Sequence, residues 1–243
     1  MKKVNSISGG KTSAYIAANY PADYNVFSLV RTDDKNCMFP DKKIRQEVSD
    51  RIGKEFIGTL EEDMIICTTE MKLQPLFDWW RSNINEVIEM RIGFRANEQR
   101  RAKTMNEKTN ENGYSTFKTI VGRTKTGNRN RWADIEWQKP SFPLIEDNIY
   151  KDNVELYWKD KPVRFAYMNN CVGCFHRNEV LLKHMSERHP NKFNWFEEAE
   201  KEGGKDVRTF KNGVTYERIR QSLKQIELFD TDFNDCDSGY CGL

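Results

Sequence analysis

The segment of this sequence best equipped for chemistry is Ser8-Gly9-Gly10-Lys11-Thr12-Ser13. A phosphate group needs hydrogen-bond donors at close range, and glycines at the start of a helix allow backbone N–H groups to approach it. The helix dipole and the flanking hydroxyl groups strengthen the attraction. We therefore expect these six residues to bind a phosphorylated ligand, with Lys11 also acting in catalysis.

The loop is not a Walker A motif. The pattern G-x-x-x-x-G-K-[ST] would align with Gly10-Lys11-Thr12, but its first glycine falls on Asn5. A glycine pair between a strand and a helix also occurs in plain tight connections. The flanking Ser8, Thr12 and Ser13 favour phosphate binding over that alternative.

Four of the six cysteines form two close pairs, Cys171-x2-Cys174 and Cys236-x4-Cys241. Four thiolates could hold a tetrahedral Zn²⁺ or a [4Fe–4S] cluster if the C-terminal segment folds back onto the first pair. The spacing does not distinguish the two metals. Reduced cysteines used in this way are typical of a cytoplasmic protein rather than a secreted one.

Charged side chains offer further contacts to a nucleotide. Asp33 follows the second predicted strand, where a carboxylate could bond a ribose or hold Mg²⁺; a solvated turn is the alternative. Arg95, Glu98 and Arg101 are spaced i, i+3, i+6, so the two guanidinium groups could bind phosphate while Glu98 orients them. The alternative for these three is an ordinary charged helix face.

The elements around these residues alternate between strand and helix. Polarity patterns and turn residues predict, in order, a strand, a helix, a strand, a helix and a strand at residues 2–8, 14–18, 25–30, 41–53 and 64–68. Such alternation is typical of the α/β class, with a parallel sheet flanked by helices.

The remaining pattern predicts more local elements. An amphipathic core-facing helix, an inserted β-hairpin and two late helices are expected at residues 73–90, 113–138, 178–189 and 216–229. Pro190 should stop the first of the late helices. We expect a nucleotide-binding domain over residues 1–169 and a helical region with the cysteine site over residues 170–243.

Composition limits the partners. With 39 basic and 37 acidic residues the chain is nearly neutral. No apolar stretch is long enough to span a bilayer, so a cytoplasmic protein without membrane contact is expected. A homodimer is compatible with this composition. Residues 91–131 are different, because they carry a local excess of basic residues, with Tyr114 and Phe117 between them and Trp132 directly after them. That region could bind tRNA or DNA, or could be a charged hairpin only.

Four motifs in order resemble a known family. Ser-Gly-Gly-x-x-Ser after the first strand resembles the PP-loop of the adenine nucleotide α-hydrolase superfamily. Residues 92–101, Phe142-Pro143-Leu144-Ile145-Glu146 and residues 170–175 resemble later motifs of the phosphoadenosine phosphosulfate reductase family in its broad sense. That family includes DNA phosphorothioation sulfurtransferase-like proteins. The resemblance implies a Rossmann-like fold and assigns Arg95, Glu98 and Arg101 to the substrate-binding stretch.

The resemblance leaves two activities open. The Lys11-Thr12-Ser13 ending resembles members that cleave ATP between the α and β phosphates, which implies adenylation of an acceptor in sulfur or nucleic-acid modification. Cys241-Gly242-Leu243 resembles the tail whose cysteine attacks the sulfonucleotide in the reductases, although no His follows it here. A reductase would use Cys241 as nucleophile, helped by Arg95, rather than as a metal ligand. A binding module without catalysis is the third alternative.

Overall fold

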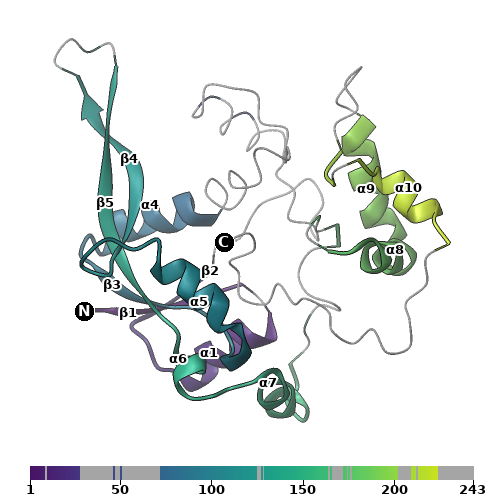
Figure 1. Cartoon of the computed structure of the whole chain (residues 1–243), viewed down its shortest axis with the longest axis horizontal. Coiled ribbons are helices and arrows are strands. Elements are labelled where there is room, and N and C mark those ends of the chain that lie inside the picture. Colours follow the sequence, from purple (N-terminus) through teal and green to yellow (C-terminus); the bar gives the residue numbers. More distant parts are fainter. Residues whose placement is uncertain are drawn as a thin grey trace.

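The computed structural model describes residues 1–8, 10–27, 46, 50, 72–124, 127, 129–163, 165, 172–173, 175, 177–201, 209–211 and 213–223. Its elements, in chain order, are β1 (Lys3–Ile7), α1 (Lys11–Asn19), β2 (Tyr24–Phe27), α4 (Gln74–Asn83), β3 (Ile88–Arg91), the 3-10 helix η3 (Ala96–Glu98), α5 (Gln99–Asn106), β4 (Ser115–Arg123), β5 (Asn130–Ser141), α6 (Pro143–Glu146), α7 (Lys151–Trp158), α8 (Glu179–Arg188), α9 (Pro190–Lys201) and α10 (Tyr216–Gln221). Figure 1 shows their arrangement.

A mostly parallel sheet forms the centre of the fold, in the order β2-β1-β3-β5-β4. The β1 strand is parallel to both β2 and β3, β3 is parallel to β5, and only β4 runs antiparallel to its neighbour. The α/β class with helices flanking a parallel sheet is therefore confirmed. The expected elements at 41–53 and 64–68 lie outside the described residues.

Helices cover both faces of this sheet. Side chains alternate between faces along a strand, so the neighbours Val4 and Asn5, both fully buried, point in opposite directions. Val4 belongs to the same apolar cluster as the buried residues of α4. Asn5 instead donates from Nδ2 to the carbonyl of Tyr20, just after α1, at 2.9 Å. The α4 and α1 helices thus lie on opposite sides of β1.

The predicted helix over residues 73–90 was wrong in its second half. The helix α4 ends at Asn83, and the chain then passes through Asn85, which adopts a positive φ of 54°. Ile88 and Met90 follow as alternate, fully buried positions of β3. Apolar residues in this stretch fit either a helical or a strand period, and the left-handed turn at Asn85 separates the two elements.

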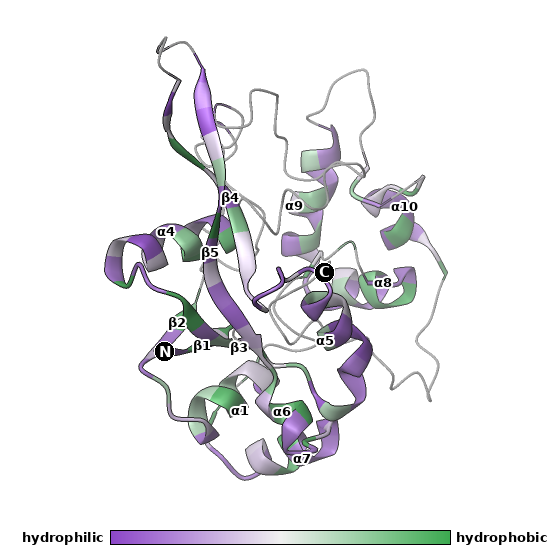
Figure 2. Ribbon diagram, turned by 60° about the vertical axis from the view of Figure 1, so that its left-hand side comes forward, coloured by the Kyte–Doolittle hydropathy of each residue, from purple (hydrophilic) through white to green (hydrophobic). Residues whose placement is uncertain are grey.

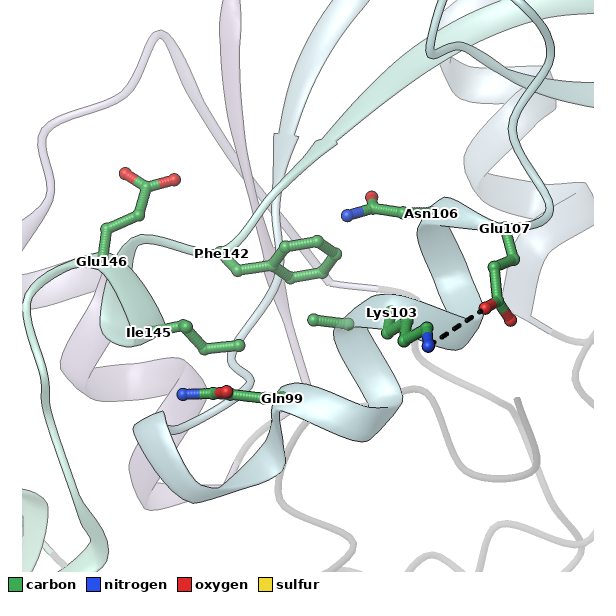
Figure 3. A pocket seen from close by; sticks show the side chains of 8 residues that line it. Gln99, Lys103, Asn106, Glu107, Phe142, Ile145 and Glu146 are labelled. Carbon is green, nitrogen blue, oxygen red and sulfur yellow. Dashed lines mark ion pairs between the residues drawn. The ribbon is translucent and has the colours of Figure 1, made fainter.

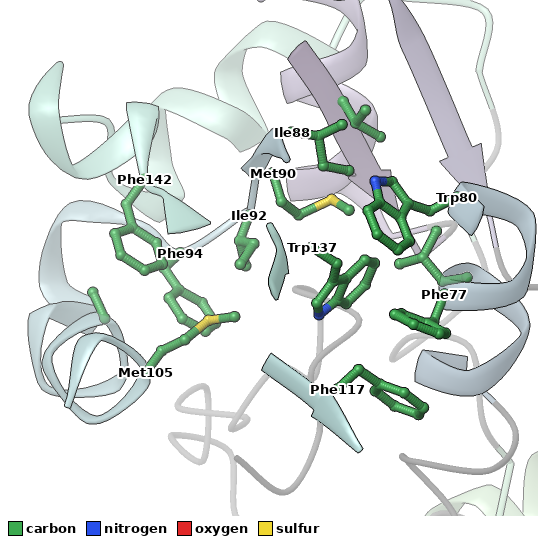
Figure 4. Packing of buried hydrophobic residues seen from close by; sticks show 13 residues of the cluster. Phe77, Trp80, Ile88, Met90, Ile92, Phe94, Met105, Phe117, Trp137 and Phe142 are labelled. Atoms are coloured by element: carbon green, nitrogen blue, oxygen red, sulfur yellow. The ribbon is translucent and has the colours of Figure 1, made fainter. Parts of the chain in front are cut away.

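Aromatic side chains make up much of the main core (Figure 4). Phe77 of α4 stacks on Phe117 of β4 with ring centroids 4.6 Å apart, and it meets Trp137 of β5 edge-on at 5.7 Å. Phe117 is only 8% exposed, so the expectation that its ring could stack on a nucleic acid was wrong. These contacts fasten the base of the hairpin to α4.

The hairpin predicted at 113–138 is confirmed as β4 and β5, paired antiparallel. Its second strand extends beyond the prediction to Ser141, and residues 138–141 pair with β3 in the parallel sheet. The hairpin is therefore continuous with the sheet rather than attached to it by loops. Its outer half projects away from the other elements in Figure 1.

The helices α8, α9 and α10 pack around a second apolar cluster that contains Phe193, Phe196 and Tyr216. The α8 helix confirms the expected helix, with Asn178 accepting from the N–H of Leu181 as its N-cap. Pro190 does not simply stop α8, because it begins α9 directly afterwards; proline fits the first position of a helix. The α10 helix ends at Gln221, earlier than expected, with Ser222 in an extended conformation.

Candidate functional site

The predicted phosphate loop connects β1 to α1 and is held by its own side chains. Gly10 is the N-cap of α1 with extended dihedral angles. The hydroxyl of Ser13 donates to the carbonyl of Gly10 at 3.0 Å and accepts from the N–H of Ser8 at 3.1 Å. Because Ser13 is fully buried, its hydroxyl shapes the turn. Gly9 lies outside the described residues.

Lys11 begins α1 and is tied to a helix that the sequence did not predict. Its ammonium group forms an ion pair with Glu155 of α7, and its carbonyl accepts a 3.0 Å hydrogen bond from the indole N–H of Trp158. Tyr15 and Tyr157 add an edge-on ring contact at 4.9 Å. Local patterns could not reveal α7 as a neighbour, since more than 140 residues separate Lys11 from Glu155 in the chain.

The loop lies at the position where parallel α/β sheets usually bind ligands. The β1 strand has β2 on one side and β3 on the other, so the strand order reverses at β1. Ligands of open α/β sheets bind outside the carboxyl ends of the strands at such a reversal. The two segments that leave the sheet there are residues 8–13 after β1 and residues 92–95 after β3.

These two segments are in direct contact. A Cβ atom at Gly93 would lie 3.5 Å from Cγ2 of Thr12 and 3.7 Å from the backbone nitrogen of Ser13, which is ordinary van der Waals distance. The backbone of residue 93 therefore runs past the first turn of α1. The motif at 92–101 and the glycine loop, far apart in sequence, form one edge of the fold.

Arg95, Glu98 and Arg101 come together, but not as one helix face. Arg95 is extended and precedes η3, whereas Arg101 belongs to α5. One oxygen of Glu98 accepts from the backbone N–H and Nε of Arg95 at 2.9 and 3.1 Å, and the other accepts from Arg101 at 2.6 Å. The alternative of an ordinary charged helix face was therefore wrong, because the chain is extended at Arg95, where Glu98 contacts its backbone.

This cluster is partly buried and holds two guanidinium groups. The side chains of Arg95 and Glu98 are 9% and 13% exposed, whereas that of Arg101 is 28% exposed. The Arg101 guanidinium also lies over the Phe94 ring at 4.4 Å. Two guanidinium groups thus meet at one carboxylate in the segment that follows β3, and guanidinium groups are well suited to bind an anionic ligand.

The Pro-Leu element after β5 closes the same edge of the sheet. Phe142 stacks on Phe94 at 5.4 Å with the rings nearly parallel, and the N–H of Ala96 donates to the carbonyl of Ile149. Tyr20, at the end of α1, donates from its hydroxyl to Asp147 at 2.6 Å. Burial and then this bond to the Asp147 carboxylate raise the pKa of Tyr20, so the phenol stays protonated.

An open pocket of ≈ 580 Å³ lies between α5 and α6 (Figure 3). Phe142 and Ile145 supply apolar lining, and Gln99, Lys103 and Asn106 supply polar groups. None of the residues that line it belongs to the β1–α1 loop. The pocket is therefore separate from the predicted phosphate position.

The four predicted metal ligands, Cys171, Cys174, Cys236 and Cys241, lie outside the described residues, as does Asp33. Among the residues that the structure does describe, no group of three His, Cys, Asp or Glu side chains could hold a metal ion. The described neighbours of the first cysteine pair are held firmly, however. The hydroxyl of Tyr216 donates to the carbonyl of Gly173 at 2.9 Å, and Nζ of Lys211 donates to that of Arg177 at 2.9 Å.

The buried carboxylate of Glu200 stabilises the backbone that carries Tyr216. Glu200 accepts from the N–H groups of Phe210 and Tyr216 at 3.0 and 2.8 Å, which fixes the turn before α10. Burial raises the pKa of Glu200, although the two backbone hydrogen bonds partly offset that effect. A Cβ at Gly173 would overlap the Phe196 ring, so a larger residue there requires the ring or the turn to shift.

Sequence reasoning missed Glu155, Trp158, Lys211 and Tyr216, because each acts through a neighbour distant in sequence. Among the described helices none is long and apolar enough to cross a membrane. Comparison with protein-family models, characterised proteins and solved structures found no significant match. The interpretation of the site therefore rests on its own residues and geometry.

Proposed function

We propose that this protein binds ATP at the β1–α1 loop and cleaves it between the α and β phosphates, transferring the adenylyl group to an acceptor in sulfur or nucleic-acid modification. The observation that carries the proposal is the close approach of the Gly93 backbone to Thr12 and Ser13 at the reversal of strand order. It places an arginine-bearing segment against the first turn of a helix, where two sources of positive potential add together.

Some residues stabilise the conformation of the loop, and others contact the ligand. Ser8 and Ser13 bond each other and set the turn, while the start of α1 offers backbone N–H groups to the phosphates. Lys11 exchanges its Glu155 partner for a phosphate oxygen. Arg95 and Arg101, aligned by Glu98, supply further charge for the triphosphate.

The chemical step is a displacement at phosphorus. A nucleophilic atom of the acceptor attacks the α-phosphorus and forms a new bond to it, the bond between that phosphorus and the α,β-bridging oxygen breaks, and pyrophosphate leaves. The acceptor proton passes to solvent. Positioning and electrostatic stabilisation of the five-coordinate transition state are the contributions that a loop and a cationic cluster make. Mg²⁺ bound to the triphosphate offsets its charge, with Asp33 as a candidate ligand.

Four cysteines remain the proposed ligands of a [4Fe–4S] cluster or Zn²⁺. Support comes from the fixed carbonyls of residues 173, 175 and 177, which Tyr216 and Lys211 hold. Fixed backbone at residues 173, 175 and 177, next to the cysteine pair in sequence, suits a metal site. If the cysteines hold a metal in this way, Cys241 is a ligand rather than a nucleophile.

The test is pyrophosphate release from ATP and Mg²⁺ in the presence of candidate acceptors, with adenylyl sulfate and thiol assayed in parallel for sulfite. Gly10→Asp is a suitable variant, because aspartate is a good N-cap residue and its carboxylate repels phosphate from the loop. We expect pyrophosphate from the wild type and none from Gly10→Asp at unchanged thermal stability. Sulfite from adenylyl sulfate, lost in Cys241→Ser, would replace this proposal with the reductase.

A further inference from the structure

The basic region at residues 91–131 divides into two parts of different electrostatic character. In the first part, Arg91 pairs with Glu89, Arg95 and Arg101 share Glu98, and Lys103 lies 3.9 Å from Glu107. In the second part, within the described residues, no ion pair involves the hairpin cations Lys118, Arg123, Arg129 and Arg131. The four hairpin cations therefore have their charge available to a partner.

Acidic residues are absent from the outer part of the hairpin. From Asn112 to Ala133 the sequence contains five Lys and Arg residues and neither Asp nor Glu, and Asp134 directly opposite Lys118 is the first carboxylate below that stretch. The outer part of the hairpin, residues 118–133, is termed the hairpin arm. It projects from the sheet in Figure 1, and hydrophilic residues occupy both strands near its tip in Figure 2. A projecting arm of one charge sign attracts polyanions.

One face of the arm combines these charges with an exposed aromatic ring. Ile120 and Trp132 are directly opposite each other across the strands and are 37% and 50% exposed. Lys118 precedes Ile120 by two residues and so shares its face. Arg123 is paired with Asn130, two residues before Trp132, which places it on that face as well. An apolar and aromatic platform thus has a cation on either side of it.

We propose that the hairpin arm binds single-stranded nucleic acid, with one base stacked on Trp132 and the phosphates contacted by Lys118, Arg123 and Arg129. Cations that follow a backbone beside an aromatic platform are the elements by which proteins bind single strands. A duplex keeps its bases stacked on one another and gains only the phosphate contacts. An anionic membrane is disfavoured because the tip is polar, with Thr124 and Asn130 and little apolar area to insert.

The arm leads directly to the candidate site. Strand β5 runs from Asn130 in the arm to Ser141 at the carboxyl edge of the sheet. The nine steps from Trp132 to Ser141 cover about 30 Å at the rise of a β-strand. A strand bound at Trp132 would reach that edge with about nine nucleotides at a stacked rise of ~3.4 Å each. The binding itself does not depend on the proposed reaction, because it needs no ATP.

The experiment measures fluorescence anisotropy of labelled oligonucleotides of about 20 residues, dT and U, with the full-length protein and without ATP. A duplex of the same length and vesicles containing phosphatidylserine are the comparison ligands. We expect single strands to bind more tightly than duplex or vesicles, with affinity falling with salt at a log–log slope of about −2 for three contacts. The two oligonucleotides determine whether DNA or RNA is preferred.

Variants identify the surface. Arg123→Gln/Arg129→Gln should reduce the slope by about 1.4, since each contact contributes ~0.7. The control Lys159→Gln/Lys201→Gln removes two charges from exposed lysines outside the arm and should leave the slope unchanged. Trp132→Ala should weaken binding by about 5- to 150-fold, whereas Trp132→Phe keeps a ring and most of the affinity.

Three outcomes would overturn the proposal. The first is no binding of single strands at low salt by a folded protein. The second is that the control Lys159→Gln/Lys201→Gln weakens binding as much as the arm variants do. The third is tighter binding of duplex or vesicles with no effect of Trp132→Ala, which would assign the arm to those partners. Loss of pyrophosphate release with oligonucleotide binding intact would reject only the proposed reaction.

Discussion

Lys11 and Glu155 form an ion pair that joins the first turn of α1 to α7. The pair is half exposed, so its own contribution to stability is small, about 0 to 1 kcal/mol. Its importance lies in position, because a phosphate bound at the start of α1 must compete with Glu155 for the ammonium group. Glu155 thus supplies the carboxylate that pairs with Lys11 of the predicted phosphate loop.

Removal of that carboxylate should favour the nucleotide. In Glu155→Gln the competition for Lys11 is lost, and we expect ATP to bind about two- to fivefold more tightly, which corresponds to less than about 1 kcal/mol. Calorimetric titration of ATP with Mg²⁺ measures the effect. Asp152→Asn removes a charge from the same helix and serves as control. Weaker binding in Glu155→Gln would mean that Glu155 positions Lys11 instead of competing for it.

The shared carboxylate of Glu98 should matter for stability. Glu98→Gln removes the carboxylate that the largely buried Arg95 shares with Arg101 and weakens the contact to the Arg95 backbone. We expect a loss of about 3 kcal/mol in the free energy of unfolding, measured by urea denaturation. Glu107→Gln, which breaks an exposed pair with Lys103, should cost less than about 0.5 kcal/mol. Equal effects would contradict the structural role given to Glu98.

The close approach of Gly173 to Phe196 predicts intolerance to a single methyl group. Gly173→Ala places a Cβ atom that overlaps the ring, so Phe196 or the turn must shift, at a cost of about 1–3 kcal/mol. Gly93→Ala meets its nearest atom at 3.5 Å and should change stability by well under 1 kcal/mol. Thermal unfolding compares the two. A metal-binding turn also predicts that Gly173→Ala lowers iron or zinc content, and an unchanged content would contradict that link.

The buried Glu200 predicts a pH dependence of stability. Burial raises its pKa, so the folded protein holds this proton more tightly than the unfolded chain. The resulting stabilisation is full below the ordinary glutamate pKa of about 4.3 and is lost as the pH rises through the raised pKa. Between pH 4 and 7 the denaturation midpoint of the wild type should therefore lose the contribution of Glu200 as the pH rises. In Glu200→Gln this loss should be absent. An identical pH profile in the variant would exclude Glu200 as its source.

The sequence predicted what depends on neighbouring residues and missed what depends on distant ones. The strand before the glycine loop, α1, the hairpin and α8 follow from local alternation, turn residues and caps, and all are present. The strand β3 was missed because Ile88 and Met90 continue the apolar spacing of α4, and the break at Asn85 is a matter of backbone conformation. Pro190 was misread because proline can begin a helix as well as end one.

The same distinction applies to the candidate site. Motif spacing grouped Arg95, Glu98 and Arg101, and the structure brings them together through Glu98. No local signal could pair Lys11 with Glu155, place Gly93 against Thr12, or show that Phe117 is buried while Trp132 is exposed. Those relationships follow from strand order and hairpin register, which are tertiary properties.

The most direct test of the central claim is equilibrium binding of ATP with Mg²⁺ to the wild type, Lys11→Gln and Lys2→Gln. Lys11 begins α1 at the carboxyl edge of the sheet, whereas Lys2 precedes β1 at the opposite edge and pairs with Glu86. The account predicts that Lys11→Gln weakens binding by about tenfold, as expected for a lost charged hydrogen bond of ~1.5 kcal/mol, and that Lys2→Gln binds as the wild type does. No ATP binding by the wild type, or equal binding by all three proteins, would contradict it.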